Sequence, residues 1–131
     1  MQARLIGLPV VHEPRGNLTF LQHPDHIPFK IKRTFWIYDV PGDKTRGGHA
    51  YHQQREFIIA LSGSFTVQVR SVDGKTASFY LRRPNVGLLL PPLHWRSMED
   101  FSTNALSLHL CDQTFTPGDR IVDYETFSTS E

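Results

Sequence analysis

Along most of this chain, apolar and polar positions alternate in short runs. Residues typical of turns, mostly Gly, Pro, Asp and Ser, separate these runs. The run from Ile31 to Val40 is rich in β-branched and aromatic residues and ends at a Pro-Gly turn. Runs of this length and composition are typical of strands rather than helices. We therefore expect strands at residues 5–11, 17–22, 31–40, 46–52, 56–61, 64–70, 76–81, 86–90, 95–98 and 106–111, and a short helix only within residues 117–127.

The turns between these runs favour one antiparallel β domain. Ser62-Gly63 is a tight hairpin signal, and Val72-Asp73-Gly74-Lys75 is a second one. No amphipathic helix of about 10 residues separates the strands, which argues against a parallel α/β sheet. The 131 residues are enough for a single core. The sequence thus predicts one all-β domain over residues 1–131, a sandwich or a jelly-roll barrel.

Charge and composition argue against several classes of partner and location. Lys and Arg number 14 against 13 Asp and Glu, so the formal net charge of +1 gives no basic field for nucleic acid. No apolar run approaches the roughly 20 residues that span a membrane. The single cysteine, Cys111, allows no intrachain disulfide and is expected to be buried and inert. Residues 1–11 lack the features of a signal peptide, and we expect a cytoplasmic protein.

Two segments place polar side chains where a strand begins. The first runs from Arg46 to His52 and the second from Pro91 to Arg96. In a small barrel such positions lie at the mouth, which is a place for a ligand. His49 titrates near neutral pH and suits a general base. Tyr51 lies two residues further and should share the same face of the strand.

The first segment also resembles the motif of metal-binding cupin barrels, because Glu56 and Gly63 are separated by the six residues that the motif has between its glutamate and its last glycine. However, Tyr51 stands where that motif has its second histidine. In the second half-motif, Arg96 replaces a histidine and would repel a metal ion. We therefore predict no metal. The alternative is a metal-dependent cupin enzyme with a rearranged set of ligands, drawn from His49, His52, Glu56 and His94.

Several segments occur together in the order of a narrower family. They are residues 14–18, 27–33, 38–39, 46–50, 61–64 and 86–88, which read PRGNL, IPFKIKR, YD, RGGHA, LSGS and VGL. In this the chain resembles the nucleotide-sugar 3,4-ketoisomerases of the cupin superfamily, the WxcM-like group, from about Leu5 to Phe127. The resemblance implies a cupin jelly roll, a homodimer without a metal or other cofactor, dTDP-4-keto-6-deoxyglucose as substrate, and a role in making sugars for surface polysaccharides.

The resemblance also implies roles for particular residues. By resemblance, His49 is the catalytic base. Tyr51 is the second catalytic candidate because it should share the strand face of His49, not because the family has a tyrosine there. Arginine suits a diphosphate because its planar fork pairs bidentately and stays charged. The Arg15-Gly16 pair looks like that of members that give the galacto product. The substrate-binding candidates are Arg15, Arg33, Arg46, Glu56, Trp95 and Arg96.

The chain departs from the family at three positions of the expected site. His49-Ala50-Tyr51 stands where the motif commonly reads His-Ala-His, Phe35 replaces a tyrosine, and Arg96 replaces a histidine. Tyr51 could supply the hydroxyl that Phe35 lacks. The changes keep open a non-catalytic module that binds nucleotide sugars. A homodimer is also favoured by the apolar segment from Leu5 to Val11, which would otherwise form an exposed edge strand.

Overall fold

The structure of the protein is a computed structural model that describes residues 2–130. Strands dominate it, as the alternating pattern predicts. They are β1 (Arg4–Gly7), β2 (Val10–Val11), β3 (Leu18–Thr19), β4 (Arg33–Tyr38), β5 (Arg46–Tyr51), β6 (Glu56–Ser62), β7 (Phe65–Ser71), β8 (Thr76–Leu81), β9 (Val86–Leu90), β10 (His94–Glu99), β11 (Leu106–Cys111) and β12 (Arg120–Ile121). A 3₁₀ turn (Pro117–Asp119) and the short helix α1 (Tyr124–Ser128) lie in the expected C-terminal segment.

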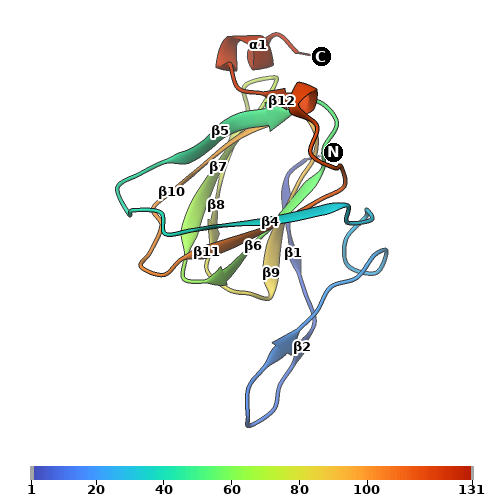
Figure 1. The fold of residues 1–131 in the computed structure, drawn as a ribbon, viewed down its shortest axis with the longest axis vertical. Helices are drawn as coiled ribbons and strands as arrows, with labels where there is room; N and C mark the ends of the chain where they lie inside the picture. The colour runs from blue at the N-terminus through green and yellow to red at the C-terminus, as the bar shows by residue number, and fades with distance from the viewer. Residues whose placement is uncertain (1, 131) are drawn as a thin grey trace.

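Two five-stranded antiparallel sheets face each other and form a jelly-roll barrel (Figure 1). One sheet has the order β1-β9-β6-β11-β4, and the other has the order β12-β5-β10-β7-β8. The all-β jelly roll with a short C-terminal helix is thereby confirmed. Neither helix in residues 2–130 is long and apolar enough to cross a membrane.

Strand β4 shows how the period of two divides the barrel into an inner and an outer face. Arg33, Phe35 and Ile37 are half-buried, whereas Trp36 and Tyr38 between and after them are exposed. Successive side chains of a strand point to opposite faces, so the first three look into the barrel. Apolar side chains fill the interior between the sheets, among them Ile58, Phe65, Val67, Leu88, Leu90 and Met98.

Glycines permit two close approaches that shape the interior. A Cβ on Gly87 would lie 2.1 Å from Cζ of Phe57, so β9 can pack over that ring only with a glycine. Gly47 has a φ of 103° and lies against the backbone of β10, where the register with β5 shifts between Arg96 and Ser97. This irregularity lies next to the pair His49 and Arg96, which are Cα partners across the two strands.

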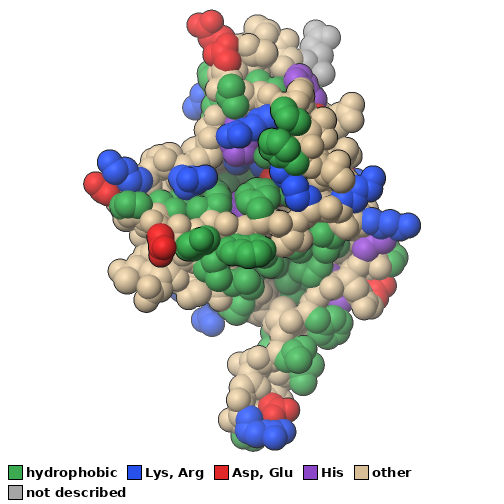
Figure 2. All heavy atoms as spheres, viewed as in Figure 1, with side chains coloured by type: hydrophobic (Ala, Val, Ile, Leu, Met, Phe, Trp, Pro, Cys, Tyr) green, Lys and Arg blue, Asp and Glu red, His purple; other side chains and the backbone are tan. Residues whose placement is uncertain are grey.

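The N-terminal hairpin of β2 and β3 stands away from the barrel (Figures 1 and 2). Its two strands pair with each other and with no other strand of the described chain, residues 2–130. Val11, Leu18 and Phe20 are between 44% and 56% exposed. The loop that follows returns to the barrel, where Ile27 and Phe29 are buried against the outer face of the first sheet.

Candidate active site

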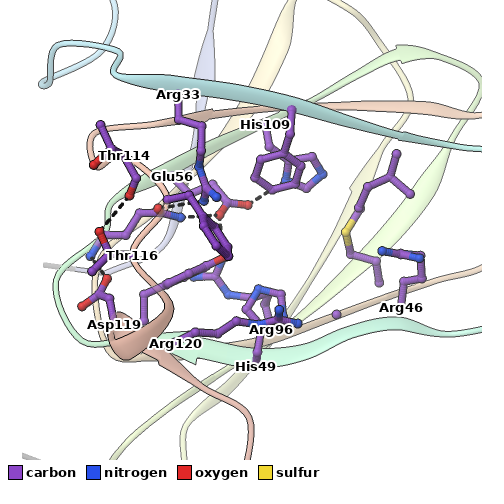
Figure 3. A pocket seen from close by; sticks show the side chains of 17 residues that line it. Arg33, Arg46, His49, Glu56, Arg96, His109, Thr114, Thr116, Asp119 and Arg120 are labelled. Atoms are coloured by element: carbon purple, nitrogen blue, oxygen red, sulfur yellow. Dashed lines mark hydrogen bonds and ion pairs between the residues drawn. The ribbon is translucent and has the colours of Figure 1, made fainter.

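A cavity of about 210 Å³ opens between the two sheets, at the end of the barrel that the apolar core does not fill. Its lining comes from β4, β5, β6, β10 and β11 and from the segment 114–120 (Figure 3). Arg33 and His109 enter from one side and His49 and Arg96 from the other, while Arg46 and Arg120 lie toward opposite ends. The site is therefore rich in cations and open to an anionic ligand.

Strand pairing brings the first group of side chains together. His49 and Arg96 are register partners, so their side chains share the inner face, and Tyr51 follows on that face two residues later. The rings of His49 and Tyr51 are 5.1 Å apart and nearly perpendicular. The Arg96 guanidinium lies 5.2 Å from the centre of the Tyr51 ring. Tyr51 is a buried phenol, and burial, followed by the charge of Glu56, raises its pKa.

A buried ion pair forms the floor of the cavity. Glu56 and Arg96 are 2% and 1% exposed, and Nη1 of Arg96 donates to Oε1 of Glu56 at 3.1 Å. Burial alone would raise the pKa of Glu56. The charge of Arg96 and a hydrogen bond from His109 outweigh burial and lower the pKa to about 2. Glu56 is therefore a carboxylate at neutral pH.

His49 is uncharged at neutral pH, because its pKa is lowered as well. Its burial, and after that the positive charge of Arg96, lower its pKa from 6.5 to about 4. A neutral imidazole carries a free lone pair, which a general base requires. The geometry thus provides a base whose proton-accepting form is fully populated at pH 7.

Three buried side-chain nitrogens lack any hydrogen-bond partner within residues 2–130, and all three belong to this cavity. They are Nε of Arg33, Nδ1 of His49 and Nη2 of Arg96. Buried polar groups are rarely left unpaired, because each costs about 1–3 kcal/mol. Their convergence on one cavity indicates that a ligand completes them.

Arg33 is held by polar and aromatic neighbours at one wall of the cavity. Its Nη2 donates to Oε1 of Gln54 at 3.0 Å, and its guanidinium lies 5.2 Å from the ring centre of Phe35 and 5.6 Å from that of Phe115. Gln54 is held in turn, because its backbone N–H donates to Oδ2 of Asp119 at 3.1 Å. Arg33 therefore presents a fixed charge.

Comparison with known proteins decides the family. Residues 1–131 match the family described as FdtA: WxcM-like, C-terminal. The chain belongs to this WxcM-like family. Over 128 residues, 97% of this chain and 91% of the relative, it is 31% identical to a TDP-4-oxo-6-deoxy-α-D-glucose-3,4-oxoisomerase of Aneurinibacillus thermoaerophilus. The predicted family is confirmed, and with it the prediction that the chain is an enzyme.

Solved structures of related enzymes have the same fold throughout. A mutant of the 3,4-ketoisomerase QdtA from Thermoanaerobacterium thermosaccharolyticum, in complex with TDP-4-keto-6-deoxyglucose, superimposes with a TM-score of 0.93 at 31% identity, covering 97% of this chain and 91% of that one. The TDP-quinovose 3,4-ketoisomerase WlaRB from Campylobacter jejuni gives a TM-score of 0.92 at 28% identity, with 98% of each chain covered.

In this WxcM-like protein most of the residues predicted from the sequence line one cavity. They are Arg33, Arg46, His49, Tyr51, Glu56 and Arg96. Arg15 and Trp95 do not line it. Arg15 lies on the projecting hairpin, where its Nε pairs with Oε1 of Glu13 at 2.9 Å and its side chain is 89% exposed.

Trp95 lies outside the cavity because it is the neighbour of Arg96 on β10. Adjacent residues of a strand face opposite sides, and Arg96 takes the inner one. The Trp95 ring instead packs against Tyr124 and Phe127 of α1, at centroid distances of 5.3 and 5.7 Å. The structure thus places Trp95, a substrate-binding candidate, against the C-terminal helix and outside this cavity.

Sequence reasoning missed several cavity residues, among them Gln54, His109 and Arg120. His109 has a signal that could have been found: Ser107, His109 and Cys111 repeat at a period of two within an otherwise apolar strand, which marks a polar inner face. Cys111 of the same strand is buried, as the sequence predicts, and burial raises the pKa of its thiol to about 12, so the thiol stays protonated and unreactive. Gln54 lies in the loop between β5 and β6, where no periodicity applies.

Of the four residues of the alternative metal site, only His49 and Glu56 line the cavity. His52 is exposed in the turn after β5, and His94 lies outside the cavity, with its Nδ1 2.9 Å from the carbonyl oxygen of Pro92. Among residues 2–130 no group of three or more His, Cys, Asp or Glu side chains gathers in a geometry that could hold a metal ion. The oxygens of Glu56 are already engaged by Arg96, Gln54 and His109.

Proposed function

We propose that this WxcM-like enzyme is a nucleotide-sugar 3,4-ketoisomerase that converts dTDP-4-keto-6-deoxyglucose into its 3-keto isomer. The relatives that match over nearly the whole chain are named for this reaction or bind this sugar nucleotide. The observation that carries the proposal is a neutral His49 beside two arginines with unpartnered buried N–H groups in one cavity.

The reaction moves a carbonyl between neighbouring carbons without net oxidation. A base removes the proton from C3, the electron pair of that bond forms a C3–C4 double bond, and O4 takes the negative charge. Protons exchange between the two oxygens of the enediol. The base then returns its proton to C4 while the carbonyl forms at C3. One base with access to both carbons and a donor for the enolate oxygen are sufficient.

His49 is suited to this base, whereas His109 is not. Nδ1 of His49 is unpartnered. Both ring nitrogens of His109 are already engaged, one by Glu56 at 2.7 Å and the other by Ser107 at 2.9 Å. A proton acceptor needs a free ring nitrogen, which His109 lacks, and His49 lines the cavity, so we assign the proton transfer to His49.

Charge-assisted donors around the cavity suit the remaining parts of the substrate. Nη2 of Arg96 is a donor for the oxygen on which negative charge develops, and the phenol of Tyr51, kept protonated by its raised pKa, can relay a proton between O3 and O4. Arg33 and Arg46 line the same cavity and can hold the diphosphate. Arg46 is exposed toward one end of the cavity, which suits the solvated phosphates.

The test is NMR of dTDP-4-keto-6-deoxyglucose with the protein in D₂O. Wild type should form the 3-keto sugar and exchange deuterium into C3 or C4. General-base catalysis contributes roughly 10²–10⁴-fold, so His49→Asn should lower turnover by that factor with dTDP binding retained. His52→Asn is the matched control, because His52 is exposed outside the cavity, and should behave as wild type.

The outcomes separate the competing functions. Binding of dTDP without exchange or isomerisation by wild type would mean a non-catalytic binding module. If His49→Asn exchanges deuterium into the sugar at the wild-type rate, the base is another residue. Loss of activity in His52→Asn, together with stoichiometric metal in the purified protein, would favour the metal-dependent alternative.

The stereochemistry at C4 is a further part of the proposal. The Arg15-Gly16 resemblance favours the galacto product, and the proton coupling between C4 and C5 in the NMR product distinguishes it from the gluco one. The cytoplasmic location and the role in sugars for surface polysaccharides also stay predictions from the sequence.

We also propose that the protein is a homodimer. The hairpin of β2 and β3 stands alone, and an isolated two-stranded hairpin is marginally stable in water. Leu18 on this hairpin is 56% exposed, and Trp36 and Tyr38 on the outer face of β4 are 57% and 62% exposed. Packing of the hairpin on a second copy would cover this apolar surface. It would also bring Arg15, which lies on the hairpin, close to the second copy.

Sedimentation equilibrium tests the dimer directly. We expect twice the 15.0 kDa chain mass at micromolar concentration. Leu18→Asp should shift the equilibrium toward monomer, whereas Thr126→Asp, on the exposed side of α1, should leave it unchanged. A monomer for wild type at these concentrations contradicts the proposal.

A further inference from the structure

A buried hydrogen-bond chain lies behind the cavity floor, and the proposed proton transfer does not use it. His109, on β11, is 2% exposed. Its Nδ1 lies 2.7 Å from Oε2 of Glu56, and its Nε2 lies 2.9 Å from Oγ of Ser107. The ring also stacks on Phe35, with centroids 4.4 Å apart and planes 7° from parallel. Contacts on both nitrogens and on a ring face hold this imidazole in one orientation.

The chemistry of the partners fixes the direction of each hydrogen bond. Glu56 is a carboxylate and can only accept, so Nδ1 of His109 carries the proton. In a neutral imidazole Nε2 then accepts from the hydroxyl of Ser107.

Glu56 passes this constraint on to Arg96. Oε1 of Glu56 accepts from Nη1 of Arg96 at 3.1 Å, while His109 holds Oε2. The Nε of Arg96 donates to the carbonyl oxygen of His94 at 3.2 Å. Two of the three guanidinium nitrogens are therefore fixed, and the planar group leaves Nη2 as its unpartnered donor in the cavity wall.

We propose that His109 is a positioning residue that holds Glu56 so that Nη2 of Arg96 meets the sugar oxygen on which negative charge develops. Ser107 secures the tautomer of His109 that this requires. The identity of the sugar oxygen rests on the proposed function, whereas the tautomer and the arrangement of Glu56 and Arg96 do not. A preorganised donor acts mainly in the transition state, so its misplacement should lower kcat rather than raise KM.

Substitution of His109 separates this role from simple packing. His109→Leu removes the donor to Glu56, and we expect kcat to fall roughly 10–100-fold, with KM and dTDP affinity within about threefold of wild type. His109→Asn can place an amide N–H near the position of Nδ1 and should recover most of the lost kcat, although it leaves a larger cavity. His52→Leu is the matched control. Equal kcat losses in the Asn and Leu variants would reduce His109 to a packing residue.

A double-mutant cycle tests whether the effect passes through Arg96. Arg96→Lys keeps the positive charge but removes the guanidinium, and with it the Nη2 donor. In that background His109→Leu should cost less than about twofold in kcat, because the donor that it positions is already absent. Independent, multiplicative losses would overturn the route through Arg96.

The ¹⁵N spectrum of the imidazoles gives a readout that needs no turnover. Subtracting the His109→Asn spectrum from that of wild type at pH 7.5 isolates the His109 signals. We expect a protonated Nδ1 and an unprotonated Nε2, and Ser107→Ala should alter the Nε2 shift. An Nε2-protonated or doubly protonated ring contradicts the proposal. If wild type fails to isomerise the sugar, the proposed function is wrong, and this spectrum still decides the arrangement at Glu56.

Discussion

Removal of the negative charge of Glu56 should expose how much the buried ion pair contributes to stability. Glu56→Gln keeps the size of the side chain and one carbonyl oxygen, which can still accept a hydrogen bond. It leaves Arg96, only 1% exposed, without its counter-ion. The substitution therefore changes charge with little change in packing.

The size of the effect follows from the pKa of Glu56, which falls from 4.5 in the unfolded chain to about 2 in the folded protein. At about 1.4 kcal/mol per pH unit, this interval corresponds to roughly 3 kcal/mol of stability. Loss of one partner of a buried pair typically costs about 3–5 kcal/mol, which agrees. Because the folded pKa is the lower one, this stability is fully present above about pH 4.5 and is lost as the pH falls toward 2.

Urea unfolding at matched protein concentration measures this difference between wild type and Glu56→Gln. We expect wild type to be about 3 kcal/mol more stable at pH 7.5, with the gap shrinking below pH 4.5. Glu125→Gln, an exposed substitution on α1, should stay within about 0.5 kcal/mol of wild type. A gap below about 1 kcal/mol at pH 7.5, or one that does not change with pH, refutes this account of the pair.

Three further predictions concern the cavity and the core. Arg46→Ala should weaken dTDP binding roughly tenfold or more in calorimetric titration, with a smaller salt dependence; an unchanged affinity would place the diphosphate elsewhere. The pH profile of kcat/KM should keep its acid limb near 4, where the pKa of His49 lies, because the base must be unprotonated; a limb near 6.5 would contradict the lowered pKa. Gly87→Ala should destabilise the fold by about 1–3 kcal/mol or more, since its Cβ would meet the Phe57 ring, whereas Gly7→Ala has open space and should be close to neutral; equal effects in the unfolding assay would count against the close approach.

The strands of this protein could be predicted because each carries a local signal. The alternation in β4 separates Arg33 and Phe35 from Trp36, and the structure follows it. The same period explains which side chains of β10 and β11 line the cavity. Trp95 and Arg96 are neighbours and cannot both face the cavity, and the inner position of His109 was readable from the polar residues at alternate positions of β11.

Other parts of the site depend on contacts between distant segments and had no local signal. Gln54 is placed by Asp119, 65 residues away, which accepts hydrogen bonds from two successive backbone N–H groups of the loop. The low pKa of His49 comes from burial and from Arg96, and that of Glu56 comes from Arg96 and His109, which outweigh its burial; only the folded barrel brings these groups together. The position of Arg15 depends on a hairpin that leaves the barrel, and no sequence pattern fixes that direction.

Arg96 gives the two titratable groups beside it opposite charge states by one electrostatic effect. Its positive charge lowers the pKa of Glu56, which stays an anion, and that of His49, which stays neutral. In the proposed reaction an enediolate oxygen at Nη2 of Arg96 adds negative charge close to both. That charge raises the pKa of His49 only while the enediolate exists, because it compensates the field of Arg96. The imidazole therefore holds the proton best during the intermediate and releases it as the neutral ketone forms again. A base that must take a proton from one carbon and return it to the next needs this reversible affinity.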